Sequence, residues 1–263
     1  MIDPGLSEKV VVITGANNPH GIGAAIARAF AVQGSRLFLH YYRSHDSTSS
    51  PEELENHPPG EAFYRAQTAK DAAEVLDSLR ALGAEATAWE ADLADPKAAV
   101  ELFDQAEARL GPVEVLIHNA AHSVADTFLP EDQPLPNQTV EKWTDRPRQI
   151  SAGSFENHFA INARAAALLM AEFGSRHIKA GRNWGRVINI STDTSRCFPS
   201  EISYGASKLA LESFSRSAAV EFGQYGITVN ILSPGPIQTG WITPPIERAA
   251  VNDTPLGRIG QPE

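Results

Sequence analysis

The sequence predicts an α/β protein built on a doubly wound parallel sheet. Short β-branched runs alternate with helical patterns through the first 120 residues, and this alternation is typical of a parallel sheet with helices on both faces. The first run leads into a glycine-rich segment that opens a helix. The composition, with 42% hydrophobic and 21% charged residues, is ordinary for a globular protein. We therefore expect one domain that spans residues 1–263.

The first half of the chain contains four predicted strand and helix units. The apolar runs predict strands at 10–14, at 37–41, up to about residue 92, and at 113–118. Apolar residues at helical spacing predict helices that begin near Gly21, that end at Gly83, and that run through 99–106. The second half adds helices at 157–173 and 204–222 and strands at 186–191 and 227–232, which makes six strands.

Two segments interrupt this regular alternation. Residues 44–66 are rich in Ser, Pro and acidic residues without a clear period, so we expect a long exposed loop. Residues 130–153 carry four prolines and several charges, and long loops of this kind often act as lids or binding elements.

Composition and charge exclude several classes of function. A net charge of −10 without a basic run argues against nucleic acid, and no stretch approaches the ~20 apolar residues that span a bilayer. The single cysteine, Cys197, cannot form an intramolecular disulfide, and the first residues do not resemble a secretory signal. The eight histidines form no pattern typical of a metal site. We therefore expect a cytoplasmic protein that binds neither membrane, metal nor nucleic acid.

The glycine-rich segment at residues 14–23 indicates a dinucleotide site. It joins a strand to a helix, where glycines let the backbone approach a pyrophosphate and the free N–H groups of the helix start face it. The end of the second predicted strand lacks an acidic residue for a ribose 2′-hydroxyl and offers Arg43, which suits a 2′-phosphate. This favours NADP(H) over NAD(H).

Tyr204 and Lys208 are spaced as neighbours on one helix face. A fixed positive charge beside a phenol stabilises phenolate and lowers its pKa from about 10. Tyr204 can then protonate a carbonyl oxygen as hydride arrives, or deprotonate an alcohol in the reverse direction. The pair alone occurs often by chance, so its interpretation depends on the motifs around it.

Those motifs are the glycine segment, a Ser/Thr-rich strand end at residues 189–193, and Asn119-Ala120-Ala121 after the fourth strand. Together with Tyr204 and Lys208 they resemble the short-chain dehydrogenase/reductase family, with a Rossmann-type fold, and members similar to 3-oxoacyl-carrier-protein reductases. The resemblance covers nearly the whole chain. It implies a small carbonyl or alcohol substrate and a homo-oligomer, either a dimer or a tetramer.

The resemblance also assigns roles to individual residues. Tyr204 matches the catalytic tyrosine, Lys208 matches the lysine that also holds the nicotinamide ribose, and Asn162 matches the asparagine of a proton relay. Asp92 matches the aspartate that contacts adenine, and Ile237 and Thr239 match contacts to the carboxamide. The remaining candidate cofactor contacts are Gly15, Asn17, His20, Gly21, Ile22, Gly23, Leu93, Asn119, Ala120, Pro234 and Gly235.

The sequence departs from the family pattern in several places. Between Gly15 and Gly21 the glycine loop has five residues, which is longer than the commoner form, and His118 and Ala121 replace an asparagine and a glycine. The catalytic hydroxyl is ambiguous: counting back from Tyr204 selects Ser191, whereas counting along the strand selects Thr192. The chain also stops where family members continue with another helix and a final strand, so we expect the fold to lack this helix and this strand.

Two hypotheses of function remain. The first is an NADP(H)-dependent oxidoreductase that acts on a carbonyl or alcohol. The second is a dinucleotide-binding protein without turnover, either a sensor or a fragment disabled by its missing end. An epimerase or a dehydratase is disfavoured, because relatives of that kind carry a longer substrate domain.

Overall fold

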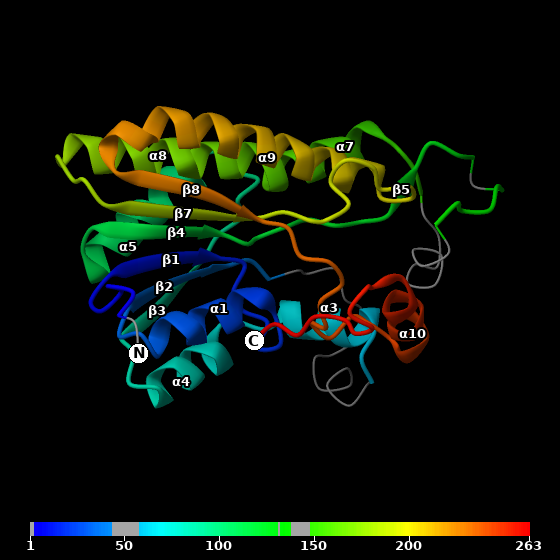
Figure 1. The fold of residues 1–263 in the computed structure, drawn as a ribbon, viewed down its shortest axis with the longest axis horizontal. Helices are drawn as coiled ribbons and strands as arrows, with labels where there is room; N and C mark the ends of the chain where they lie inside the picture. Colours follow the sequence, from blue (N-terminus) through cyan, green and yellow to red (C-terminus); the bar gives the residue numbers. More distant parts are fainter. Residues whose placement is uncertain (1–2, 44–57, 131, 138–147) are drawn as a thin grey trace.

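The computed structural model describes residues 3–43, 58–130, 132–137 and 148–263. Its centre is a six-stranded parallel sheet in the order β3-β2-β1-β4-β7-β8, as Figure 1 shows. The strands are β1 (Val10–Thr14), β2 (Arg36–Tyr41), β3 (Ala86–Glu90), β4 (Val113–His118), β7 (Gly185–Ile190) and β8 (Ile227–Leu232). The six strands expected from the sequence are confirmed, and β8 lies at one edge of the described sheet.

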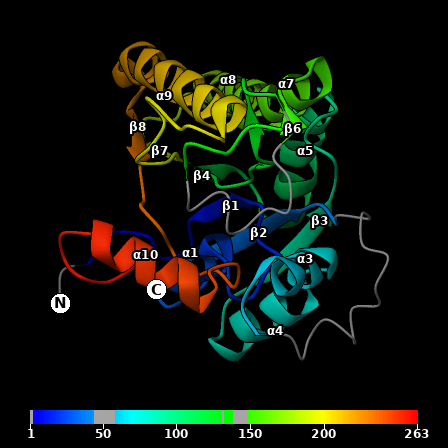
Figure 2. The same ribbon diagram turned by 90° about the vertical axis from the view of Figure 1, so that its right-hand side faces the viewer.

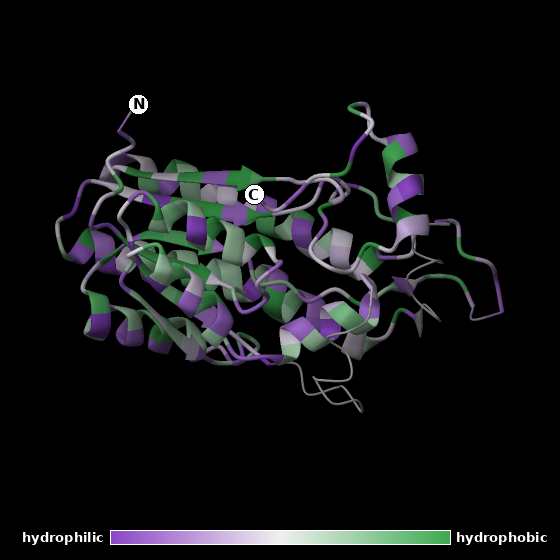
Figure 3. Ribbon diagram, turned by 90° about the horizontal axis from the view of Figure 1, so that it is seen from below, coloured by the Kyte–Doolittle hydropathy of each residue, from purple (hydrophilic) through white to green (hydrophobic). Residues whose placement is uncertain are grey.

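Helices cover both faces of the sheet, and the alternation of side chains along each strand explains why. Val11 and Ile13 of β1 pack with α1 (Ile22–Ala31) and α4 (Ala73–Ala81). Val10 and Val12 point the other way, toward the layer of α5 (Ala98–Leu110), α8 (Ala166–Lys179) and α9 (Ile202–Phe222). The strands are therefore apolar on both sides, whereas the helices carry apolar and polar residues together (Figure 3). The expected doubly wound α/β fold is confirmed.

The strand order reverses direction between β1 and β4. The chain runs outward from β1 through β2 to β3, and then returns to β4 and runs outward through β7 to β8. In open parallel sheets, ligands bind at the carboxyl ends of the strands beside such a reversal. The fold therefore directs attention to the loops after β1 and β4.

The segment before β7 forms one continuous helical stretch with three parts. Helix α7 (Ala152–Phe159) starts at Ser151, whose Oγ accepts the N–H of Ser154 and caps the first turn. A π-helical stretch (Ala160–Ala165) follows and leads directly into α8. The helix expected at 157–173 is therefore confirmed in its core but is longer at both ends.

The first predicted loop is wrong over part of its length. Residues 44–57 lie outside the described residues, but Glu61–Ala69 forms the helix α3 rather than a loop. Only Ala66 and Gln67 of this helix are buried, so its sequence shows no strong apolar pattern at helical spacing. The glycine loop and the loop after β8 contact the helix and hold it in place. Figure 2 views this end of the molecule and shows α3 and α10 below the sheet, with α7 and α9 above it.

The second predicted loop also contains regular structure. Residues 131 and 138–147 lie outside the described part, but β6 (Arg148–Gln149) pairs with β5 (Asp126–Thr127), and α7 begins at Ala152. A short 3₁₀ helix (Gly223–Tyr225) leads into β8. After β8 the chain forms α10 (Pro244–Asp253), which the sequence patterns do not predict; it begins with proline, a residue that suits a first helical turn. Across the residues that the structure describes, no helix is long and apolar enough to cross a membrane.

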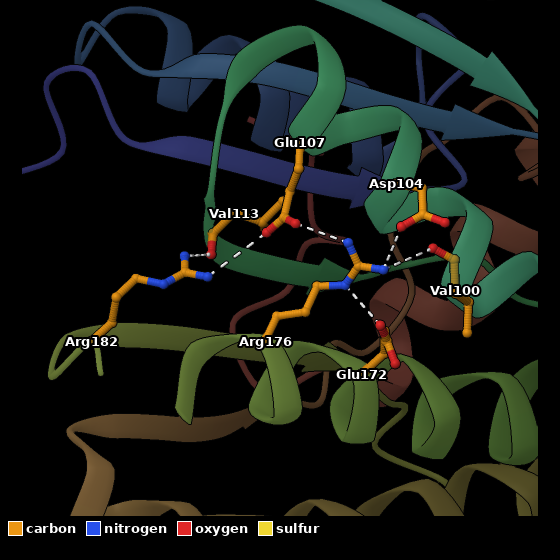
Figure 4. Close-up of polar contacts among 7 residues, drawn as sticks. All are labelled: Val100, Asp104, Glu107, Val113, Glu172, Arg176 and Arg182. Carbon is orange, nitrogen blue, oxygen red and sulfur yellow. Dashed lines mark hydrogen bonds and ion pairs between the residues drawn. The ribbon is translucent and has the colours of Figure 1, made fainter. Parts of the chain in front are cut away.

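A cluster of charges ties α5 to α8 (Figure 4). The Arg176 guanidinium of α8 donates to Asp104 at 2.6 Å and Glu107 at 2.8 Å, both on α5, and to Glu172 at 2.7 Å on its own helix. Arg182 extends the cluster through an ion pair with Glu107 at 3.7 Å, and it also donates to the carbonyl of Val113 at 2.9 Å. Arg176 is thus shared by three carboxylates, and this fixes two neighbouring helices of one layer against each other.

Candidate functional site

The glycine loop after β1 packs too closely for side chains at two of its glycines. Gly15 has φ +68°, and a Cβ there would lie 2.7 Å from Cα of Ala120. A Cβ at Gly23 would lie 2.6 Å from the carbonyl oxygen of Gly15. Real Cβ atoms do not approach other atoms so closely. These two positions require glycine in order to bring the loops after β1 and β4 together.

Helix α1 opens at this loop with its N-terminus uncapped. Gly21 is the N-cap residue, and among the residues that the structure describes no side chain caps the first turn, which begins with Ile22. The first N–H groups of a helix have no partner within the helix, and the helix dipole places partial positive charge there. The start of α1 therefore has the donors of an anion site.

The loop after β4 is bonded to the same strand end. The Thr14 hydroxyl accepts the N–H groups of Asn119 and Ala120, each at 3.0 Å. The Asn119 side chain donates to the carbonyl of Gly15 at 2.8 Å. His118 is fully buried with Nδ1 3.4 Å from the Thr14 hydroxyl, and burial lowers its pKa to about 3. The histidine that replaces the family asparagine is therefore a neutral packing residue.

The extra residues of the glycine loop contact other loops. The Asn17 side chain is buried and donates to the carbonyls of Thr68 at 2.9 Å and Lys70 at 2.8 Å. The exposed His20 places its ring 5.5 Å from that of Phe63. Both side chains are thus directed toward α3, although both are expected cofactor contacts on sequence grounds.

Arg43, the residue expected to bind a 2′-phosphate, is engaged in a two-pronged ion pair. Its Nε and one terminal nitrogen each donate to a carboxylate oxygen of Glu90 at 2.8 Å, and these hydrogen bonds raise its pKa. Glu90 ends the neighbouring strand β3, directly opposite Tyr41 of β2. The sequence does not reveal this partner, because the pairing of β2 with β3 brings it close.

Asp92, the expected adenine contact, and Leu93, another expected cofactor contact, follow the end of β3. Asp92 accepts the N–H of Ala94 at 2.8 Å, which fixes the turn after β3, and Leu93 is buried beneath this turn. These residues therefore lie beside Arg43 and Glu90 at the carboxyl end of β3.

Tyr204 and Lys208 lie one turn apart near the start of α9. The Lys208 side chain is only 1% exposed, and its Nζ donates to the carbonyl of Ile190, at the end of β7, at 2.8 Å. Nζ lies 5.7 Å from the centre of the Tyr204 ring. Burial lowers the pKa of Lys208 to about 8. The lysine is anchored to the sheet and carries a titratable amine close to the phenol.

The expected fall in the pKa of Tyr204 is not what the structure shows. Burial raises the pKa of Tyr204 above its usual value, and negative charges at Glu201 and on an ionised Tyr64 would raise it further. The reason is that the fold encloses the phenol. Burial disfavours the negatively charged phenolate, and it also disfavours the positive charge on Lys208 that was expected to stabilise the phenolate. The phenol of the unliganded protein is therefore neutral.

The two candidate hydroxyls at the end of β7 have different partners. The Ser191 hydroxyl is buried and donates to Glu212 of α9 at 2.8 Å, as does Ser195 at 2.7 Å. Burial alone would raise the pKa of Glu212, but the hydrogen bonds from Ser195, Ser191 and Arg216 outweigh it and lower that pKa. Thr192 is half-buried and lies 3.0 Å from the hydroxyl of Thr194. The Thr192 hydroxyl also donates to the Asp193 carboxylate, but over a longer distance of 3.4 Å. Ser191 is thus held more tightly by its carboxylate than Thr192 is.

Asn162 lies fully buried in the π-helical stretch between α7 and α8. Its side chain accepts the N–H of His122 and donates to the carbonyl of the same residue, both at 2.8 Å. It also donates to the Ser207 hydroxyl of α9 at 2.9 Å. Asn162 therefore joins the loop after β4 to the helix that carries Tyr204 and Lys208, and π-helical turns are frequent at functional sites.

The loop after β8 completes the ring of segments. The carbonyl of Pro234 accepts the N–H of Asp193, at 3.2 Å, and the Asp193 carboxylate lies where a Cβ of Gly235 would meet it. Ile237 forms a bridge with Gly260, and the carbonyl of Thr239 accepts a hydrogen bond from Asn18 at 3.2 Å. The loop therefore lies across the same end of the sheet as the glycine loop.

Sequence reasoning missed two buried carboxyl groups beside the start of α9. Glu201 is 4% exposed and lies 3.5 Å from the Ser123 hydroxyl, and burial, with a contribution from Asp126, raises its pKa to about 8. Asp126 accepts the N–H of Ser203 at 2.9 Å and the hydroxyl of Ser154 at 2.5 Å. No local pattern reveals this pair, because its members are brought together only by the fold.

Comparison with known proteins agrees with this geometry. A family model described as short chain dehydrogenase matches residues 61–247. An uncharacterised oxidoreductase, YjdA, of Bacillus subtilis is 32% identical over 257 residues, covering 97% of this chain and 86% of that protein. An NADPH-dependent aldehyde reductase-like chloroplast protein of Arabidopsis thaliana is 27% identical, covering 97% of this chain and 84% of that protein.

A solved structure shares the fold. It is that of a putative short-chain alcohol dehydrogenase from Sinorhizobium meliloti, with a TM-score of 0.74 and 21% identity, covering 97% of this chain and 85% of that one. Enzymes of this kind are oxidoreductases that bind a nicotinamide dinucleotide and act on small molecules. With the family model matching most of its length, this chain belongs to the short-chain dehydrogenase family.

Proposed function

We propose that the protein is an NADP(H)-dependent oxidoreductase that interconverts a carbonyl compound and an alcohol, in the manner of 3-oxoacyl reductases. The observation that carries this proposal is the arrangement on α9. Lys208 is anchored to the end of β7, the strand next to β4, and Tyr204 lies one turn before it on the same helix. We also expect a cytoplasmic homo-oligomer that acts as one domain.

The residues present fit a dinucleotide. Gly15 and Gly23 leave no room for a Cβ, so the backbone of the loop is bare, and the uncapped start of α1 offers N–H donors to a pyrophosphate. In the bound state, Gly21 and Ile22 would face the phosphates, Asp92 the adenine, and Asn119 and Ala120 the groove. Pro234, Gly235, Ile237 and Thr239 would hold the nicotinamide side.

The bound cofactor supplies a hydride to the carbonyl carbon. The chain's own residues handle the oxygen and the proton. The hydroxyl of Thr192 donates a hydrogen bond to the carbonyl oxygen, because that of Ser191 is engaged with Glu212. Tyr204, which burial keeps protonated, donates its proton to the same oxygen as negative charge develops there. Lys208, with an amine of pKa about 8, returns a proton to Tyr204, and Asn162 holds the neighbouring loop.

Substituting Tyr204 tests the chemistry. Tyr204→Phe removes only the hydroxyl, so we expect NADPH affinity within about twofold of wild type and a loss of reduction of at least about 100-fold. The assay follows NADPH fluorescence for binding and absorbance for turnover, with a panel of ketones that includes 3-oxoacyl thioesters. Turnover retained in Tyr204→Phe would contradict the mechanism. NADPH binding to wild type without turnover of any compound would favour a binding protein instead.

The preference for NADP(H) rests on Arg43 and on the resemblance to a relative named as NADPH-dependent. Because Glu90 holds Arg43 through two hydrogen bonds, a 2′-phosphate must compete with that carboxylate. We expect Arg43→Asp to shift preference toward NADH, and Glu90→Gln to tighten NADPH binding several-fold while leaving NADH unchanged. Dissociation constants for both dinucleotides check this. An unchanged ratio in Arg43→Asp would remove Arg43 from the phosphate site.

A further inference from the structure

The strongest feature that the proposed chemistry does not use is helix α3. It follows the segment after β2, yet both of its ends are bonded to loops of the site. Its last turn is held by the glycine loop, since the Asn17 side chain donates to the carbonyls of Thr68 and Lys70. The last carbonyls of a helix have no partner within the helix, so Asn17 satisfies groups that would otherwise need water.

The other end of α3 is held by the loop after β8. The N–H of Gly60 donates to the carbonyl of Gly240 at 2.8 Å. Gly240 has φ +99°, and a Cβ there would lie 2.8 Å from the Phe63 ring. The ring of Phe63 therefore packs directly on the backbone of this loop, and this contact requires glycine at position 240.

The glycine loop and the loop after β8 are also bonded to each other. Asn18 donates to the carbonyl of Thr239 at 3.2 Å, and His20 meets the Phe63 ring on the side of α3. The three segments thus form a closed set of contacts. Asn17, Asn18 and His20 all belong to the stretch that lengthens the glycine loop, so the unusual length of this loop has a structural use.

We propose that α3 is a fixed wall beside the cofactor site and that Asn17 is the positioning residue for this wall. The cofactor site rests on the proposed function, whereas the contacts that hold α3 do not. The wall explains why an extended glycine loop and a helix after β2 occur in the same chain.

The wall is tested by hydrogen exchange in the cofactor-free protein. In Asn17→Ala, we expect the amides of residues 62–70 to exchange at least about tenfold faster, while the amides of α5 keep their wild-type rates. Thr68→Ala is the matched control, because it removes a side chain from α3 and keeps the carbonyl that Asn17 binds. NADPH should also bind Asn17→Ala several-fold more weakly. Unchanged exchange of α3 in Asn17→Ala would overturn the wall, and faster exchange of α5 as well would show general destabilisation and overturn the positioning role.

If the wild-type protein binds no NADPH, the proposed function fails, while the exchange result still decides whether Asn17 holds α3 in place.

Discussion

Ser191 and Thr192 are adjacent in sequence, but their hydroxyls face different surroundings. Ser191 donates to the buried carboxylate of Glu212 at 2.8 Å, whereas the half-buried Thr192 contacts Thr194 and donates to Asp193 at the longer distance of 3.4 Å. A hydrogen bond to a charged group is worth about 2 kcal/mol. The serine therefore contributes to the packing of α9 on β7, and we propose that the threonine supplies the catalytic hydroxyl.

This assignment predicts opposite effects of two alanine substitutions. Thr192→Ala should lower kcat about 100-fold, as expected when a donor to a developing oxyanion is removed, with little change in stability. Ser191→Ala should lower the free energy of unfolding by about 2 kcal/mol and leave kcat nearly unchanged. Urea unfolding and steady-state kinetics check both, and Thr192→Ser should retain activity. The reverse pattern would assign the catalytic role to Ser191.

At the scale of a single element, the N-terminus of α9 carries a carboxyl pair with unequal roles. Asp126 accepts the backbone N–H of Ser203 and so binds the first turn of the helix. Glu201, just before the helix, is buried with a pKa raised to about 8. Its neutral form is therefore the one that folding favours at neutral pH, and its ionisation would place a second negative charge beside Asp126 and near Tyr204.

The sign of the pH effect follows from this raised pKa. Because the folded protein binds the Glu201 proton more tightly than the unfolded chain, stability is greatest below the ordinary glutamate pKa and falls as pH rises through about 8. We expect Glu201→Gln, which mimics the neutral form, to remove most of the fall in unfolding free energy between pH 5 and pH 9. Glu221→Gln, at an exposed position on the same helix, is the control. If the unfolding free energy falls equally between pH 5 and pH 9 in wild type and in Glu201→Gln, Glu201 does not cause the fall.

At the scale of the whole molecule, the expected cofactor lies between the two halves of the sheet. We expect the loops after β1 and β3 to hold one end and the loops after β4 and β8 the other, so that binding would connect segments that are far apart in the chain. A ligand that binds only the folded state stabilises it by mass action, by about 2.7 kcal/mol at a concentration of 100 times Kd.

Thermal unfolding measures this linkage. At 100 times its Kd, NADPH should raise Tm by about 5–10 °C, given the size of the chain. Arg43→Asp should reduce the shift with NADPH more than the shift with NADH at fixed concentrations. Asn17→Ala should lower the NADPH shift, since it loosens the wall beside the glycine loop. A Tm that does not respond to either dinucleotide would contradict the proposed site.

Local pattern and spacing in the sequence determined the sheet and most of its flanking helices. They also determined two motifs near the carboxyl ends of the strands, namely the glycine segment and the Tyr204–Lys208 pair. The apolar runs of β1 and β4 and the glycine segment are local signals, since each depends on residues close together in the chain. The same is true of the one-turn spacing of Tyr204 and Lys208. These features could be predicted because nearby residues decide them.

The tertiary structure alone decided which partners these residues meet. The pairing of β2 with β3 puts Glu90 on Arg43, α9 puts Glu212 on Ser191, and the loops after β1 and β8 turn Glu61–Ala69 into a packed helix. The enclosure of Tyr204 likewise reverses the expected direction of its pKa, because desolvation depends on every segment that covers the phenol. Contacts between distant segments leave no local pattern, so only the folded chain reveals them.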